Sequence, residues 1–453
     1  MITGRMRQFS LVLGGALCVL VSACAPSVRF HQQVNNQRAH RNHDGALKTF
    51  QENRKNYGKA ERLLAIYEEG ALLYYAKRFP EALKVFEQAD ILGEELYTTS
   101  VTRTLATGIV NDTMSEYSGE DFERVMVNIF KALIYAEMGN TESALVEARR
   151  VDEKLALYNT KYEESQNVYT EDAFGRFITG ILYLHSGTSE DLQDAGVAFR
   201  KAFEIYGGDY QKHYRSAVPK QLAVLAGEAA FLSGDELPDG AVPPPEGLTP
   251  QDFGDVVVIH LNGLVPEKVE KSWIIPTPDG HVIKVAYPEY RRRQYFNKGS
   301  VIRATRIGEG DGLPYEIASA ATEEAQPLGD IARKNLEDRL GRIKAKAVAR
   351  ALAKYAATKA TEEAIKRSRG NDPNAQLIGS LVGLAMNVAA VATENADTRH
   401  WGFLPDQIRI ARLRLAPGRY ELSAQLSVGK MVPIGEVEVQ AGKAAVVSFD
   451  TVD

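Results

Sequence analysis

Cysteine is almost missing from this sequence of 453 residues, and so are the short motifs that mark common enzymes. The two cysteines, Cys18 and Cys24, both lie in the first 24 residues, so the rest of the chain has no disulfide framework. The sequence contains no HExxH, no CxxC, no Walker loop and no G-x-S-x-G around a serine. We therefore expect no catalytic residues and no cofactor, and we interpret the chain as a non-enzymatic protein.

Histidine offers no strong metal-binding pattern either. The eight histidines are scattered, and His40-x2-His43, with His31 nearby, falls in a polar segment. An HxxH pair in a flexible segment is a weak ligand set. The sequence thus predicts no bound metal.

The chain also lacks an excess of positive charge, and long apolar runs are scarce. The formal net charge is −5, and it becomes −7 once residues 1–23, with Arg5 and Arg7 and no acid, are removed. A mildly acidic chain of this kind is not expected to bind nucleic acid. The apolar stretch 377–392 has sixteen residues, fewer than the ~20 that a membrane-spanning helix needs.

The N-terminus has the pattern of a secretion signal. Arg5 and Arg7 precede an apolar run, FSLVLGGALCVLV, which ends at Ser22-Ala23-Cys24. Val21-Ser22-Ala23-Cys24 resembles a bacterial lipobox, which implies cleavage after residue 23 and lipidation of Cys24. An ordinary signal peptide or a retained membrane anchor are the alternatives. Residues 24–42 are polar and are interpreted as a tether.

Helical repeats are expected between residues 43 and 235. The stretch Gly70–Ala89, GALLYYAKRFPEALKVFEQA, matches the spacing of a tetratricopeptide-type helix pair. Small residues let two helices approach closely, and aromatic residues fill the wider gaps beside them. The pattern recurs with drift, and the predicted repeat-core positions are Gly70, Ala82, Phe86, Ala89, Ala132, Tyr135, Ala144, Gly180, Tyr183, Ala195, Phe199 and Ala202.

Two insertions lengthen these repeats, at 93–124 and 153–172. Insertions in repeat proteins often lie on the binding face. They contain five tyrosines that are candidate partner-binding residues, namely Tyr97, Tyr117, Tyr158, Tyr162 and Tyr169. Tyrosine gives a large contact area at low entropic cost, which suits recognition. The alternative is that these side chains cap the repeat cores, with their hydroxyls reaching water.

The second half is expected to be a separate α+β domain, 255–453, after a Pro/Gly-rich linker at 236–254. Strands are predicted within 255–306, and helices at 329–369 and 375–396 that pack together as a hairpin. An antiparallel β-meander is expected at 406–451, pairing with the earlier strands into one sheet or small sandwich on which both helices pack. The predicted fold class is α+β, an all-α tetratricopeptide-like repeat domain followed by antiparallel sheet with a long helical hairpin.

Two features of the predicted hairpin allow sharper hypotheses. Residues 331–369 contain twelve Lys/Arg and four Asp/Glu, which suits anionic lipid headgroups, lipopolysaccharide phosphates or an acidic partner, or simply a solvated face. Gly379-x3-Gly383 lies in the apolar stretch 377–392. This helix either packs inside the domain or supports an oligomer or a membrane-inserted hairpin.

Several segments resemble a family of uncharacterised proteobacterial lipoproteins with tetratricopeptide-like repeats. They are Tyr117-Ser-Gly-Glu-Asp-Phe-Glu123, the run from Ala144 through Glu147-Ala-Arg-Arg150, Asn262-Gly263-x-x-Pro266, and Asn395-Ala-Asp-Thr-Arg-His-Trp-Gly-Phe-Leu-Pro405. The resemblance covers most of the chain after residue 24 and implies localisation and architecture, but no biochemical activity. Ala25 after the lipobox cysteine, by resemblance to enterobacterial sorting, implies the outer membrane.

These observations favour a lipid-anchored protein on the periplasmic face of the outer membrane. Its repeats are expected to act as a scaffold for an unknown protein partner, in envelope assembly or a secretion-type complex. One alternative is an oligomerising or membrane-inserting envelope component that uses the Gly/Ala-rich helix at 377–392. Another is a peptidoglycan or glycan binder, or an enzyme, that uses the β domain.

Overall fold

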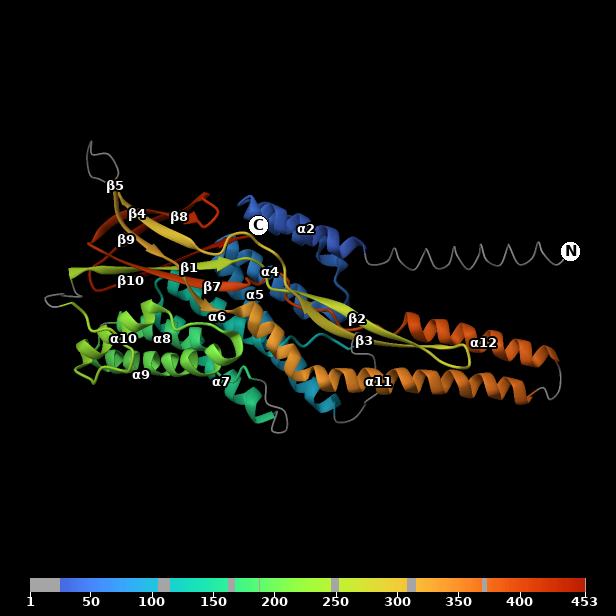
Figure 1. Cartoon of the computed structure of the whole chain (residues 1–453). Coiled ribbons are helices and arrows are strands. Elements are labelled where there is room, and N and C mark those ends of the chain that lie inside the picture. Colours follow the sequence, from blue (N-terminus) through green and yellow to red (C-terminus); the bar gives the residue numbers. More distant parts are fainter. Residues whose placement is uncertain are drawn as a thin grey trace.

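The computed structural model describes residues 25–104, 115–161, 168–186, 188–245, 252–307, 315–368 and 373–452. The protein is a mixed α+β molecule. A helical N-terminal half is followed by strands, two long helices and further strands (Figure 1). Cys24 and Tyr162 lie outside the described residues.

The helical half consists of successive helices whose neighbours pack in pairs. The helices are α2 (Ala25–Ala39), α3 (His43–Asn53), α4 (Arg62–Tyr75), α5 (Phe79–Thr104), α6 (Asp121–Glu137), α7 (Thr141–Lys161), α8 (Ala173–Leu184), α9 (Ser189–Ile205) and α10 (Lys220–Ser233), with a π-helical turn, η5 (Tyr206–Tyr214), after α9. The main pairs are α4 with α5, α6 with α7, and α8 with α9.

Two of these pairs share one packing device. A Cβ added to Gly70 of α4 would lie 2.5 Å from the ring of Phe86 on α5, and one added to Gly180 of α8 would lie 2.4 Å from the ring of Phe199 on α9. Both contacts are too short for any side chain, so glycine lets the second helix press its phenylalanine onto the first. The predicted repeat-core residues are buried, except that Tyr135 is only partly buried.

The segment 24–42 is not the expected tether, because α2 begins at Ala25 and packs onto the body. Phe30 and Val34, one helical turn apart, are buried in the main core, and Arg38 one turn further on is buried against Asp450 of the last strand. The high polarity of this segment hid a narrow buried stripe with i,i+4 spacing, which long polar neighbours flank.

The strands form two four-stranded sheets and a two-stranded ribbon. Strands β1 (Gly254–Asn262), β6 (Glu323–Gln326), β7 (Gln407–Leu415) and β10 (Ala444–Thr451) form the first sheet, in the order β10-β1-β7-β6. Strands β4 (Ser300–Arg306), β5 (Tyr315–Ala321), β8 (Gly418–Leu426) and β9 (Met431–Val439) form the second, in the order β5-β4-β8-β9. The ribbon pairs β2 (Glu267–Pro276) with β3 (Val282–Arg291).

The expected antiparallel meander at 406–451 is therefore wrong, although the small sandwich is present. Strands β7 and β8 lie in different sheets, and β10 pairs in parallel with β1. Every residue of β1 is buried, because its alternate side chains face the helices on one side and the second sheet on the other. A strand buried on both faces carries no alternation, so the sequence did not indicate its central position.

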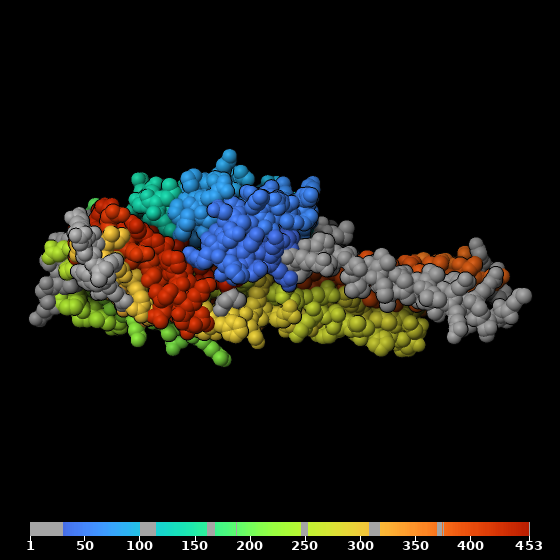
Figure 2. Space-filling view, turned by 90° about the horizontal axis from the view of Figure 1, so that it is seen from above, coloured from blue at the N-terminus to red at the C-terminus, as the bar shows by residue number. Residues whose placement is uncertain are grey.

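The two long helices leave the body and pack beside the two-stranded ribbon instead of covering a four-stranded sheet, so that part of the expected arrangement is also wrong. Helix α11 (Leu328–Ser368) begins in the body, runs outward beside β3, and returns as α12 (Pro373–Ala392). Figures 1 and 2 show that α11, α12 and the β2–β3 ribbon form one projecting element, which we call the arm. The predicted pairing of α11 with α12 is confirmed. No helix in the described ranges is long and apolar enough to cross a membrane.

Both halves contribute to one continuous core. Apolar side chains of α3 to α10 cluster with side chains from the inner face of β1, β7 and β10 and from the start of α11. The described part of the predicted linker, up to residue 245, lies against α10, where Val242 N donates to Ala223 O at 2.9 Å. The inner face of the helical array is thus covered by the protein's own sheet.

Candidate functional site

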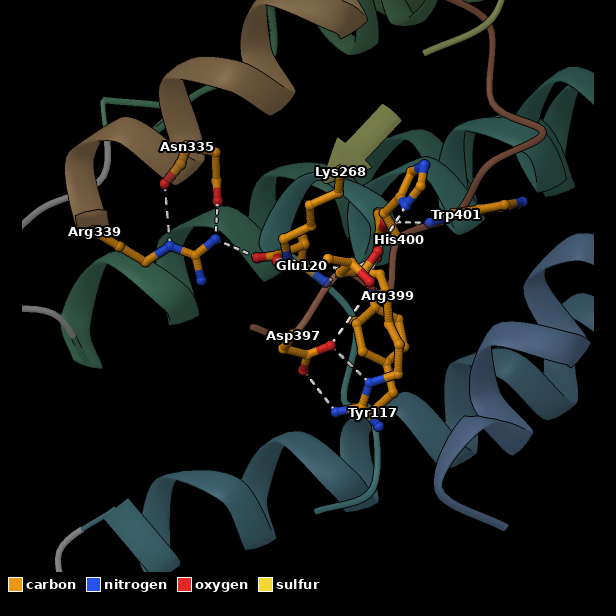
Figure 3. Close-up of polar contacts among 12 residues, drawn as sticks. Tyr117, Glu120, Lys268, Asn335, Arg339, Asp397, Arg399, His400 and Trp401 are labelled. Carbon is orange, nitrogen blue, oxygen red and sulfur yellow. Dashed lines mark hydrogen bonds and ion pairs between the residues drawn. The ribbon is translucent and has the colours of Figure 1, made fainter. Parts of the chain in front are cut away.

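The motif 395–405, singled out by sequence, lies where the helical half, the arm and the first sheet meet (Figure 3). Trp401 is fully buried and stacks on Tyr67 of α4, with ring centroids 4.7 Å apart and planes 15° from parallel. Phe86 and Phe130 approach the same indole from α5 and α6. Trp401 therefore closes the helical core from outside, as a plug carried by the second half of the chain.

A buried carboxylate at the start of α6 joins three elements. Glu120 accepts hydrogen bonds from Nζ of Lys268 on β2, at 2.7 Å, and from the Arg339 guanidinium on α11. Burial alone would raise the pKa of Glu120, but the charges of Arg339 and Lys268 outweigh it and lower that pKa. The arm is thus attached to the helical half by an ionised, doubly paired glutamate.

A second buried carboxylate receives the backbone of the motif. Glu123 accepts hydrogen bonds from Trp401 N at 2.6 Å and Glu120 N at 2.9 Å, and from the Tyr117 hydroxyl. Burial and the neighbouring Glu120 charge raise the pKa of Glu123 to about 7. The Glu120–Glu123 pair is a capping box, in which the third residue of the helix bonds the cap backbone.

Arg399 ties the same motif to the entry loops of α4 and α6. Its guanidinium pairs with Asp397 at 2.6 Å and donates to the carbonyl oxygens of Ala60, at 3.0 Å, and Ser115, at 2.9 Å. It also lies 5.3 Å from the ring centre of Tyr117. Glu120, Glu123, Lys268, Arg339 and Arg399, with Trp401, form what we call the junction. Glu123 is completely buried and Glu120 nearly so, so the junction suits fixing geometry better than chemistry on a substrate.

Four of the five candidate partner-binding tyrosines are buried, so they do not form an exposed recognition surface. Tyr97 and Tyr158 enclose the Arg124 guanidinium, whose central carbon lies 4.2 and 4.7 Å from their ring centres. Tyr117 donates to Glu123 of the junction, and Tyr169 donates to the buried carboxylate of Asp172. The alternative that the tyrosines cap the repeat cores describes them better, although the hydroxyls of Tyr117, Tyr158 and Tyr169 contact buried charged groups instead of water.

A groove separates the helical half from the edge of the first sheet. It has a volume of about 1300 Å³ and lies between the turns that end α6 and α8 and the strands β9 and β10. Five acidic residues line the groove, namely Glu137, Glu142, Asp191, Glu436 and Glu438. The basic residues in its lining are His185 and Lys443. Sequence reasoning missed this groove, because its two walls are about 300 residues apart along the chain.

Strand β10 presents a free backbone edge to this groove. In its parallel pairing with β1, Lys443 O accepts from Asp255 N, so odd-numbered residues of β10 point toward β1 and even-numbered ones away. Ala444 and Val446 therefore direct their N–H and C=O groups outward, and both line the groove. At Ser448 the outward N–H is already occupied, because it donates to Glu137 at 3.3 Å. Within the described chain, β10 pairs with no strand except β1.

The described residues contain no group of three or more His, Cys, Asp or Glu side chains placed to hold a metal ion. A scan against protein-family models finds no match, and searches of curated proteins and of solved structures find no similar protein.

Proposed function

We propose that this protein is a lipid-anchored, non-enzymatic scaffold of the bacterial envelope that binds an extended, basic segment of a partner protein in the groove beside β10. The observation that carries the proposal is the free outer edge of β10 at the floor of an acidic groove. An exposed strand edge accepts an additional strand through main-chain hydrogen bonds, and side-chain pockets supply specificity.

Charge and size favour this occupant. Five acidic side chains line the groove against one lysine and one histidine. Glu137 and Glu436 already pair with Lys77 and Arg419, and the other three acids still outnumber the lysine, which favours a basic segment over an acidic one. The volume of about 1300 Å³ exceeds the ~300–1,000 Å³ of typical small-molecule sites, and it suits a peptide. The Gly70–Phe86 and Gly180–Phe199 contacts support a tetratricopeptide-like array. The sheet covers that array's inner face, so we place the binding surface at the edge where array and sheet meet.

The anchor is the second part of the proposal. The lipobox-like sequence ending at Cys24 supports acylation of this cysteine, which directly precedes α2. We propose that the lipid anchors the protein to the periplasmic face of the outer membrane. Metabolic labelling with a palmitate analogue tests it. We expect label on the wild-type protein and none on Cys24→Ala, and an unlabelled wild-type protein would contradict the anchor.

Peptide binding tests the groove. A fluorescent decapeptide that alternates Val with Lys should bind, measured by anisotropy, whereas the matching peptide with Glu in place of Lys should not. Ala444→Pro removes one outward N–H at the first residue of the edge strand, where proline is tolerated, and should weaken binding at least about tenfold. Glu438→Lys should also weaken it, and Glu52→Lys, the same charge change at an exposed residue of α3 that does not line the groove, should not. Equal binding of both peptides, or no effect of Ala444→Pro, would overturn the proposal.

A further inference from the structure

The outer face of α12 carries an exposed apolar stripe. Leu377, Leu381, Leu384 and Val388 follow the spacing i, i+4, i+7, i+11, and their exposed fractions are 62%, 57%, 52% and 52%. This spacing places all four on one side of the helix. Four large apolar side chains that share one side and stay half exposed mark a contact surface.

The opposite side of α12 is already occupied. A Cβ on Gly379 would lie 2.8 Å from the Lys366 side chain of α11, and one on Gly383 would lie 2.9 Å from Glu362 of the same helix. Asn387 exchanges hydrogen bonds with the backbone of Val282 on β3. Glycine-mediated packing on α11 thus fixes the roll of α12 and turns the stripe outward.

The arm has the charge distribution of a surface that meets anions. Residues 373–392 contain no charged residue, whereas residues 344–368 of α11 contain seven Lys/Arg and two Glu, a net charge of +5. Five of these cations pair with carboxylates, and two of those carboxylates, Asp279 and Glu394, lie outside α11, so a local excess of +3 remains. Exposed apolar residues continue on the ribbon, where Ile274 is 67% exposed. An apolar stripe beside a cationic helix is typical of elements that lie in the headgroup region of an anionic membrane.

The place of the arm relative to the anchor favours the same partner. Helix α2 starts one residue after Cys24, and His31 in its first half contacts Glu68 of α4 and Phe403 of the motif 395–405, which follows the last helix of the arm. The arm projects from this end of the body (Figure 1), and α2 and the arm are visible from the same side (Figure 2). A lipid on Cys24 would hold the membrane surface close to the base of the arm, because no tether separates it from α2.

From these observations we infer that the arm binds an anionic phospholipid surface through the stripe Leu377, Leu381, Leu384 and Val388. The location argument rests on the proposed lipidation of Cys24, whereas the stripe and its charge do not. The arm gives the lipid-anchored protein a second membrane contact. Two weak contacts on one molecule hold it in a single orientation that a lone lipid would not fix.

Vesicle co-sedimentation of the chain without residues 1–24 tests the arm in the absence of any lipid on the protein. We expect binding to vesicles of phosphatidylglycerol and phosphatidylethanolamine, and weaker binding to phosphatidylcholine alone. The double variant L381E/L384E should bind the anionic vesicles at least about tenfold less. Val197→Glu, at a residue of α9 that is 54% exposed, is the matched control and should bind like the wild type. Circular dichroism establishes that each variant is folded.

Three results would overturn the inference. The wild-type chain does not bind anionic vesicles, or L381E/L384E binds them as well as the wild type does. The third result is a dimer in sedimentation equilibrium that L381E/L384E dissociates, together with no binding to vesicles. It would assign the stripe to contact with a second copy of this chain. Because the chain without residues 1–24 carries no lipid, a failure of this inference can be told apart from a failure of Cys24 labelling.

Discussion

At the scale of single residues, the junction depends on one carboxylate that faces two cations. Glu120 and Lys268 are both buried, and Arg339 pairs with the same carboxylate from α11. Removing one partner of a buried ion pair leaves the other charge desolvated without compensation, which costs more than the pair itself contributes. The attachment of the arm to the helical half should therefore be sensitive to neutralisation of Glu120.

We predict that Glu120→Gln lowers the free energy of unfolding by about 3 kcal/mol at pH 7, because Lys268 and Arg339 lose their counter-charge. Urea denaturation followed by circular dichroism measures it. The control is Glu81→Gln, which breaks an exposed pair with Arg78 and should change stability by less than about 0.5 kcal/mol. Equal effects of the two substitutions would contradict the role given to the junction.

The pairing of Glu120 with Lys268 and Arg339 also leads to a prediction about how stability depends on pH. The folded pKa of Glu120 lies below that of an unfolded glutamate, about 4.3, so its contribution is present at neutral pH and is lost as pH falls below that value. The difference in stability between the wild type and Glu120→Gln should consequently narrow in acid. A constant difference from pH 7 to pH 3 would show that the lowered pKa is not the source of the effect.

At the scale of elements, the helix pairs and the strands differ in how well their sequences indicated them. The helices and their pairing follow from local 3.6-residue periodicity, and α11 and α12 were predicted close to their observed bounds. Apolar and basic residues alternate in strand β7, a pattern typical of a half-exposed strand. Instead Arg412 is buried, paired with Glu228 of α10 and Asp255 of β1, at 2.6 and 2.5 Å. The carboxylates of Glu228 and Asp255, from distant elements, neutralise the basic side of β7, so that this side can be buried.

The glycine–phenylalanine contacts give a prediction for the helix pairs. We expect Gly70→Ala and Gly180→Ala each to destabilise the protein by about 1–3 kcal/mol, because the new methyl group overlaps a buried ring. Thermal unfolding measures this. Gly207→Ala has open space around the new Cβ and serves as the control. A stabilising effect of Gly70→Ala would show that α4 and α5 are not packed as described.

At the scale of the whole molecule, the two halves share one core with Trp401 at the boundary. We predict that they unfold in one transition, and that Trp401→Ala lowers the stability of both by about 3–5 kcal/mol through the cavity it leaves. Calorimetry of the wild type should show one peak, moved to lower temperature in the variant. Two separate peaks would mean that the halves are independent domains, as the linker at 236–254 had suggested.

The sequence by itself determined the identity of most helices and strands, the α11–α12 pairing and the lipobox-like N-terminus. These are carried by local spacing and motifs within short stretches. Only the tertiary structure decided that the candidate tyrosines are buried, that β10 joins β1 in parallel, and that Glu120 meets Lys268 and Arg339 across 148 and 219 residues. Such pairings depend on which distant surfaces cover each other, and burial, free edges and counter-charges exist only once that packing is complete.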